Sequence, residues 1–194
     1  GITSNLTADF TVNPDFSQIE SDRPQIEVNR RYPLFFSELR PFFVEGAEIF
    51  NIVAPVTFVH TRTIVDPDYG AKLSGQLGRF SLGVLTANDR APGKVDDTSD
   101  PAFSQKAQTL ITRVRYDLYA ESHLGAIVTN REFLDDHSRV FGLDGNFRLS
   151  PTIVADFRLV GSSYKNHSEK ESDGHMISSR IVQNSRNVRW TLFA

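Results

Sequence analysis

The sequence predicts an all-β fold: an antiparallel up-and-down meander that is part of an outer-membrane-type β-barrel and carries an irregular, plug-like segment. Apolar and polar residues alternate with a period of two along much of the chain, for example over residues 113–118. The predicted connections alternate between short and long, which is typical of barrels with short periplasmic turns and longer extracellular loops. Predicted strands of about 8–12 residues also suit a tilted crossing of a ~30 Å hydrocarbon layer.

The composition of the 194-residue chain excludes several classes of protein. A hydrophobic content of 39% with 15 Phe residues excludes intrinsic disorder of the whole chain. The formal net charge is -3 and no basic stripe is present, which argues against nucleic-acid binding. The absence of Cys excludes thiol catalysis, thiolate zinc sites and disulfides. The mean hydropathy of -0.30 does not argue against a barrel, because alternating strands average to a neutral value.

We expect one partial β-barrel domain over residues 1–194, with an irregular plug or constriction at residues 14–54 and the strand meander at residues 55–194. The chain starts at Gly1 without Met and ends at Ala194 on a strand, so we expect a fragment of a longer protein. Nine strands are expected, in chain order at residues 6–12, 71–77, 80–87, 108–119, 124–130, 139–149, 152–162, 175–183 and 188–194.

The connections follow from turn residues and polarity. Short links are expected at residues 78–79, 120–123, 150–151 and 184–187. Longer polar loops are expected at residues 88–107, 131–138 and 163–174. Because Pro151 cannot donate a ladder hydrogen bond, Ser150-Pro151 is expected to be the turn of one antiparallel hairpin. Phe141, Phe147 and Phe157 should share one face of that hairpin, opposite Asp144, Arg148, Asp156 and Arg158.

Charged residues occupy the polar rows in mid-strand. Such charges fit an aqueous lumen, and they also fit the solvated surface of a β-sandwich. The strand lengths and the loop pattern favour the lumen. The residues expected to face it are Arg113, Arg115, Asp117, Arg148, Asp156 and Arg158.

The N-terminal segment breaks the alternation with two Phe-Phe pairs, at residues 35–36 and 42–43. Four Phe side chains are too apolar for a solvated loop, so the segment is expected to pack inside the barrel or across its mouth. Arg40 is expected to hold a carboxylate bidentately there. Glu38, Glu45 and an acid of the lumen are the alternatives for its partner.

Two long motifs resemble a known sequence family. The stretches are residues 12–22, Val-Asn-Pro-Asp-Phe-Ser-Gln-Ile-Glu-Ser-Asp, and residues 35–46, Phe-Phe-Ser-Glu-Leu-Arg-Pro-Phe-Phe-Val-Glu-Gly. They strongly resemble the DUF5916 family, and residues 61–64 and 70–75 also resemble segments of that family. The matching motif residues are Asn13, Asp15, Gln18, Glu20, Glu38, Arg40, Phe42, Phe43, Glu45, Arg62 and Lys72.

The resemblance implies a Gram-negative envelope protein of the cell outer membrane with a C-terminal β-barrel-like region. Family members often carry a family 9-type carbohydrate-binding module, and some are labelled membrane-associated hydrolases. Outer-membrane lipid and a glycan or other small ligand are therefore the expected partners. The family has no established catalytic residues to transfer to this sequence.

Chemistry can be assigned only to weak candidates. Asp15, Glu20, Glu38 and Glu45 could act as paired carboxylates on a glycoside, or could simply cap turns and pair with Arg40. Asp66 begins a calcium-like stretch, but Gly70 and Leu77 stand where a calcium loop needs oxygen ligands. The His residues show no ligand spacing, so neither a metal nor a cofactor is expected.

The sequence is therefore compatible with three functions. The first is a non-enzymatic outer-membrane β-barrel for ligand passage or glycan-related binding. The alternatives are a membrane-associated hydrolase that uses the N-terminal carboxylates, and a soluble carbohydrate-binding β-sandwich.

Overall fold

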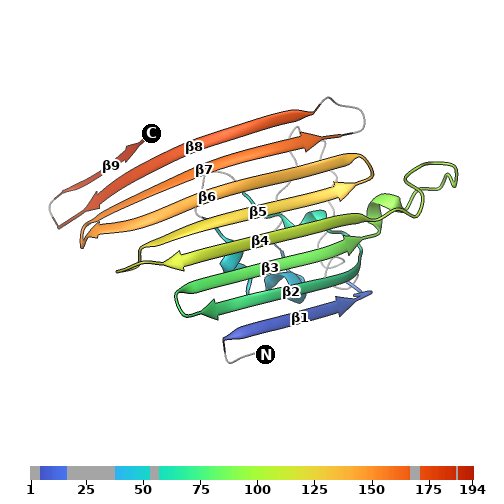
Figure 1. The fold of residues 1–194 in the computed structure, drawn as a ribbon, viewed down its shortest axis with the longest axis horizontal. Helices are drawn as coiled ribbons and strands as arrows, with labels where there is room; N and C mark the ends of the chain where they lie inside the picture. The colour runs from blue at the N-terminus through green and yellow to red at the C-terminus, as the bar shows by residue number, and fades with distance from the viewer. Residues whose placement is uncertain (1–4, 17–37, 53–56, 167–170, 187) are drawn as a thin grey trace.

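The fold is a single antiparallel sheet of nine strands in chain order (Figure 1). The computed structural model describes residues 5–16, 38–52, 57–166, 171–186 and 188–194. The all-β, up-and-down meander is confirmed, and the sheet is not closed into a barrel. The strands are β1 (Leu6–Val12), β2 (Pro67–Leu77), β3 (Phe80–Asp89), β4 (Ala107–Asp117), β5 (His123–Phe133), β6 (Asp136–Ser150), β7 (Ile153–Lys165), β8 (Ser172–Asn184) and β9 (Arg189–Phe193).

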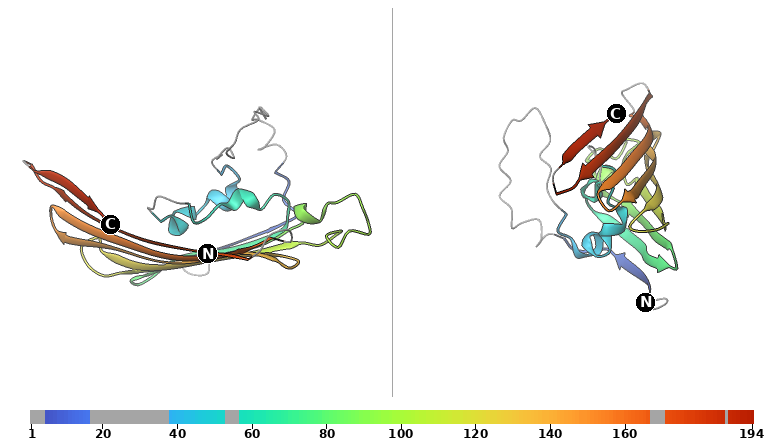
Figure 2. Two further views of the ribbon diagram at one scale, coloured as in Figure 1. Left: turned by 90° about the horizontal axis from the view of Figure 1, so that it is seen from above. Right: turned by 90° about the vertical axis from the view of Figure 1, so that its left-hand side faces the viewer.

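Four short helices accompany the sheet: α2 (Pro41–Val44), η1 (Ala47–Phe50), η2 (Thr61–Thr63) and η3 (Ala91–Gly93). The sheet is curved, and α2, η1 and η2 lie on its concave side (Figure 2). The η3 helix opens the long connection between β3 and β4. In the part of the chain that the structure describes, no helix has the length and apolarity needed to cross a membrane.

One predicted loop is wrong. Residues 131–138 were expected to be a longer connection, but β5 runs to Phe133 and β6 starts at Asp136. The ladder continues through polar residues because they pair across the strands: Arg139 Nη2 lies 2.8 Å from Glu132 Oε1. The polar residues here predicted a loop, but cross-strand ion pairing extends the two strands through them.

The start of the meander also differs from the expectation. Residues 57–66 are irregular apart from η2, and the second strand begins at Pro67, earlier than the expected residues 71–77. A register shift between Pro67 and Tyr69 marks the place where the chain enters the sheet.

The hairpin of β6 and β7 is confirmed. Asp144 lies opposite Arg158, and the turn at residues 151–152 contains Pro151. The rings of Phe147 and Phe157 stack with centroids 6.2 Å apart. A Cβ at Gly145 would collide with the Phe157 ring, so glycine leaves the space for this pair on one face of the hairpin.

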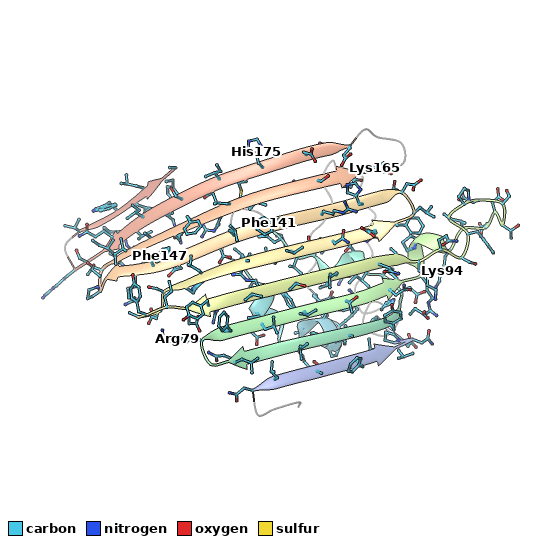
Figure 3. All side chains as sticks on the ribbon, viewed as in Figure 1. Arg79, Lys94, Phe141, Phe147, Lys165 and His175 are labelled. Carbon is cyan, nitrogen blue, oxygen red and sulfur yellow. The ribbon has the colours of Figure 1, made fainter. Side chains whose placement is uncertain are left out.

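The two faces of the sheet differ in the side chains that they expose and bury. Large apolar side chains on the convex face are exposed, including Phe10 at 79% and Ile177 at 74%. Figure 3 views this face, with Phe141 and Phe147 labelled on it. The concave face instead contains buried polar and charged side chains: Lys72, Ser81, Thr109, Arg113, Asp144, Asp156 and Arg158.

Candidate functional site

The hydrophobic core lies between the concave face and the segment that crosses it. We call residues 38–52 and 57–64 the docked segment. Phe43, Phe50 and Ile64 of the docked segment are buried, with at most 5% of each residue exposed. They pack against the concave face at Leu85, Ala87 and Ile111. Burying such side chains contributes roughly 1.5–3 kcal/mol each, which is what fixes the docked segment on the sheet.

Arg40 connects the two ends of the docked segment. Its Nε and Nη2 donate to the two carboxylate oxygens of Glu38 at 2.8 and 2.7 Å. Its Nη1 donates to the carbonyl of Ile64 at 2.6 Å, and Nη2 also donates to the carbonyl of Thr61 at 3.0 Å. The guanidinium lies 4.3 Å from the centroid of the Phe43 ring. Of the three alternatives for the partner of Arg40, the structure selects Glu38.

Glu38 is held as a carboxylate. Burial by itself raises its pKa, but hydrogen bonds from Arg40 and Thr61 oppose burial and lower the pKa from 4.5 to about 2. The backbone N–H groups of Leu39 and Arg40 also donate to Oε1 of Glu38. Glu38 therefore holds no proton to give near neutral pH, which argues against a role as general acid.

Lys72 ties the docked segment to β2. Its Nζ donates to the carbonyls of Phe42 and Glu45 at 2.7 and 2.6 Å, at the C-terminal end of α2. Asp9 of β1 lies 3.3 Å from the same ammonium group. The side chain is almost completely buried. Lys72 is thus satisfied by two backbone carbonyls and one carboxylate, and it has a positioning role.

Glycines on the concave face give the docked segment room to approach. A Cβ at Gly83 would lie 2.7 Å from Cγ2 of Ile49 and 2.9 Å from the ring of Phe50. A Cβ at Gly70 would lie 2.9 Å from the ring of Phe42. Only glycine permits such contact between these strands and the helices above them.

A network of charged residues covers the concave face beside the docked segment. Arg113 forms a bidentate ion pair with Asp144, in which Nη2 lies 2.8 Å from Oδ2. Asp156 is shared by Arg158 at 2.7 Å and Arg180 at 2.8 Å. These residues come from β4, β6, β7 and β8, and the strand register brings them onto one face.

The residues expected to face a lumen all lie on this concave face. Alternation and register connect them: Arg115 is opposite Gly125, which is opposite Asp144, which is opposite Arg158. Arg115 and Asp117 form a half-exposed ion pair at 3.1 Å. The set that the concave face brings together is Arg113, Arg115, Asp117, Arg148, Asp156 and Arg158.

The candidate carboxylates of the N-terminal region are not gathered into one site. Asp15 follows β1 and is exposed, and the Glu45 side chain is also exposed at the end of α2. Glu38 is committed to Arg40. Glu20 and Gln18, like Phe35 and Phe36, lie outside the described residues. Within the described ranges, no group of three or more His, Asp or Glu residues could hold a metal ion.

Asn13 and the Asp66–Gly70 stretch belong to a charged cluster at one end of the sheet. Arg90 Nη2 donates to Asn13 at 2.6 Å and to Asp66 at 3.0 Å. The hydrogen bond from Lys94 lowers the pKa of Asp66, although partial burial opposes it. Asp68 pairs with Lys106 at 2.6 Å. Cations of the chain therefore already neutralise these two carboxylates. Arg62 lies half-buried in η2.

The comparison with known families matches the N-terminal part of the chain. The family described as domain of unknown function (DUF5916) matches over residues 1–59. The DUF5916 resemblance is thereby confirmed for these residues. No curated protein and no solved structure matches the chain.

The DUF5916 match covers β1 and the docked segment as far as Val59. The motif residues Glu38, Arg40 and Phe43 fall within it, and the structure gives all three a role in docking. Arg62 and Lys72 lie beyond the matched residues, although Lys72 completes the same attachment. The described part of the second DUF5916 motif, residues 38–46, therefore belongs to a segment that packs on the sheet.

Sequence reasoning did not single out Asp89 or Arg180, and it placed Asp144 on the polar face of its hairpin without naming it among the residues expected to face a lumen. Asp89 is buried and accepts from the backbone N–H groups of Val65, Asp66 and Ala91. Arg180 shares Asp156, and Asp144 holds Arg113. The sequence signal for Asp144 and Arg180 was their position in the period-two alternation, which places each in the polar row of its strand.

Proposed function

We propose that this chain forms part of the wall of an outer-membrane β-barrel, with the docked segment as a constriction on the inner side. In this proposal the convex face contacts lipid and the concave face lines an aqueous interior. The role is non-enzymatic: passage or binding of a small polar ligand such as a glycan.

The observation that carries the proposal is the inverted polarity of the sheet. A protein sheet in water normally exposes its charges and buries its apolar row. Here the arginine and aspartate pairs are buried on the concave face. The convex face exposes a broad apolar surface built from Phe10, Leu77, Phe80, Leu110, Val114, Leu124, Val128, Phe141, Leu143, Leu159 and Ile177. A soluble monomer rarely exposes so many large apolar side chains on one face, and lipid is the solvent that suits them.

The ends of the strands support an orientation. Three of the four connections at the end labelled by Lys94 and Lys165 in Figure 3 are longer than the turns at the end labelled by Arg79. The turn between β2 and β3 spans residues 78–79, and the turn between β6 and β7 spans residues 151–152. By the usual asymmetry of barrels, the Arg79 end faces the periplasm and the Lys94 end faces outward.

The two alternatives receive less support. A β-sandwich needs a second sheet, and the described residues form one sheet only. The hydrolase hypothesis depends on the N-terminal carboxylates, of which Glu38 is an ionised partner of Arg40. The barrel proposal uses both the apolar convex face and the docked segment.

Adjacent residues on opposite faces test the proposal. Because the chain has no Cys, the variants Ile177→Cys and Ser178→Cys each carry one spin label, near the middle of β8. In lipid vesicles, the label at residue 177 should be accessible to oxygen and protected from a water-soluble nickel complex. The label at residue 178 should show the opposite preference. Equal contact with water at both sites, or a monodisperse protein without detergent, would contradict the proposal.

A further inference from the structure

A second feature of the concave face is a cavity of about 250 Å³ between η1 and strands β4 to β8. Ile49, Asn51 and Ile52 of the docked segment form one wall. The sheet forms the other wall with four arginines and two aspartates: Arg113, Arg115, Arg158, Arg180, Asp144 and Asp156. Ligand pockets typically begin at about 300 Å³, so this cavity suits one small polar group.

The cavity contains more cations than its own carboxylates neutralise. Arg113 is paired with Asp144, but Arg158 and Arg180 both depend on Asp156. Two guanidinium groups and one carboxylate thus give these three residues a net charge of +1. Arg115 reaches Asp117 at the rim, where both side chains are 39% exposed. Nη2 of Arg115 also donates to Oγ of Ser81 at 3.4 Å, on β3 and therefore on the side of β4 away from β8. The shared carboxylate leaves Arg180 with donors for a further anion.

Neutral donors are also open in the cavity. Asn51 and Asn146 both line it, and neither side-chain amide has a hydrogen-bond partner among the described residues. Nε of Arg113 is buried without an acceptor among the same residues. Polar groups in such positions are normally satisfied by protein, water or ligand. Oδ1 of Asp156 is also buried without a hydrogen-bond partner among these residues, although it lies 2.7 Å from Nη1 of Arg158. The excess of donors in this cavity therefore comes from its charged groups, four arginines against two aspartates.

We propose that this cavity binds a small oxyanion, a carboxylate or a phosphate group, through Arg180, which shares Asp156 with Arg158. The guanidinium fork matches the two oxygens of either group, and the amides of Asn51 and Asn146 are placed to bind adjacent hydroxyls. A sugar acid combines both features. Every wall of the site is made of described residues, so the proposal does not depend on the membrane role of the convex face.

Calorimetric titration of the detergent-solubilised protein at low ionic strength tests the site. The probes are glucuronate, inorganic phosphate and glucose. Glucuronate or phosphate should bind while glucose does not, and the stronger of the two anions identifies the group. Arg180→Gln should weaken binding about tenfold or more, because it removes a charge-assisted bond, and Asn146→Ala should weaken glucuronate binding less, because it removes a neutral hydrogen bond to a hydroxyl group.

The matched control is Arg139→Gln, which removes an exposed arginine paired with Glu132 on the other face and should leave the affinity unchanged. Circular dichroism establishes that each variant keeps its strands, and the two independent cavity variants guard against loss of folding in one of them. Three results would overturn the proposal: no anion binding at millimolar concentration, equal binding of glucose, or equal weakening by Arg139→Gln. The spin-label experiment at residues 177 and 178 does not depend on anion binding. It therefore tests the membrane proposal independently of the anion site.

Discussion

Arg40 shows how one buried residue organises a segment. It is 1% exposed, and its guanidinium bonds Glu38 and the carbonyls of Thr61 and Ile64. These partners lie on both sides of η1, so the side chain closes the docked segment into a loop. A buried charge with complete hydrogen bonding is stable, whereas a buried charge that has lost its partner is costly.

Replacing Arg40 with Ala should therefore destabilise the protein by about 3–5 kcal/mol, because Glu38 would be left without its cation. Arg40→Lys should recover only part of this loss, since an ammonium group cannot bond two oxygens and two carbonyls in the same plane. The free energy of unfolding in urea, followed by circular dichroism, gives the measurement. Arg139→Ala breaks an exposed pair and should change it little. Equal effects of the two Ala variants would contradict the assigned role of Arg40.

Acid should weaken the same contact. The pKa of Glu38 is lowered to about 2 in the folded protein, so folding favours its ionised form. The stability that it contributes is complete above about pH 5 and is lost as the pH falls towards 2. Glu38→Gln should be less stable than the unmodified chain at pH 7, and the difference should shrink towards pH 2. A difference that stays constant from pH 7 to 2 would show that ionisation of Glu38 is irrelevant.

At the scale of elements, glycines of the sheet determine where the short helices can pack against it. Gly83 lies under Ile49 and Phe50, while a Cβ at Gly161 of β7 would meet nothing within 4 Å. Both glycines are strand residues, so a β-branched substitution has the same intrinsic effect on the backbone. Gly83 lies on the concave face beneath η1, whereas Gly161 lies opposite Phe141 on the convex face, away from the docked segment.

Gly83→Val should push η1 away from the sheet, with an overpacking penalty of about 1–3 kcal/mol. Limited proteolysis should then cut within residues 38–52 about fivefold faster or more, because cleavage follows the population of the undocked state. Gly161→Val is the matched control and should leave the cleavage rate unchanged. Fast cleavage within residues 38–52 of the unmodified protein would mean that the docked segment is mobile and does not constrict anything.

Across the whole molecule, the exposed apolar face and the buried ion pairs point to two different solvents. In the proposed barrel, the convex face lies against hydrocarbon and the concave face against water held between protein walls. The separation of the two faces is a property of strands β1 to β8 together. Single strands with mixed faces occur equally in soluble sheets.

An arginine on the convex face distinguishes the two environments. Leu143→Arg near the middle of β6 should reduce the stability of the vesicle-inserted protein by about 2–4 kcal/mol if this face contacts lipid. Gln76→Arg adds the same charge to the concave face and should have little effect. The fraction of folded protein in vesicles, measured by gel mobility without heating, reports both. A Leu143→Arg variant that is more stable and soluble without detergent would contradict lipid contact.

The sequence alone determined the number of strands, their order and the faces of their side chains, but not all of the strand bounds. Alternation with a period of two is a local consequence of the pleated backbone, so Arg113 and Arg148 could be assigned to the polar row from their neighbours. The burial of Phe43 and the need of Arg40 for a carboxylate also followed from residue type. The family resemblance followed from motifs that lie within residues 1–59.

Only the tertiary structure decided which partners meet. Arg113 and Asp144 are 31 residues apart, and their pairing depends on the register of three strands. Cross-strand pairing of Arg139 with Glu132 turned an expected loop into strand. The choice of Glu38 for Arg40, and the docking of α2 and η1 over Gly70 and Gly83, depend on curvature and close contact. These are properties of distant segments brought together, because burial and register are set by the whole sheet and not by any one strand.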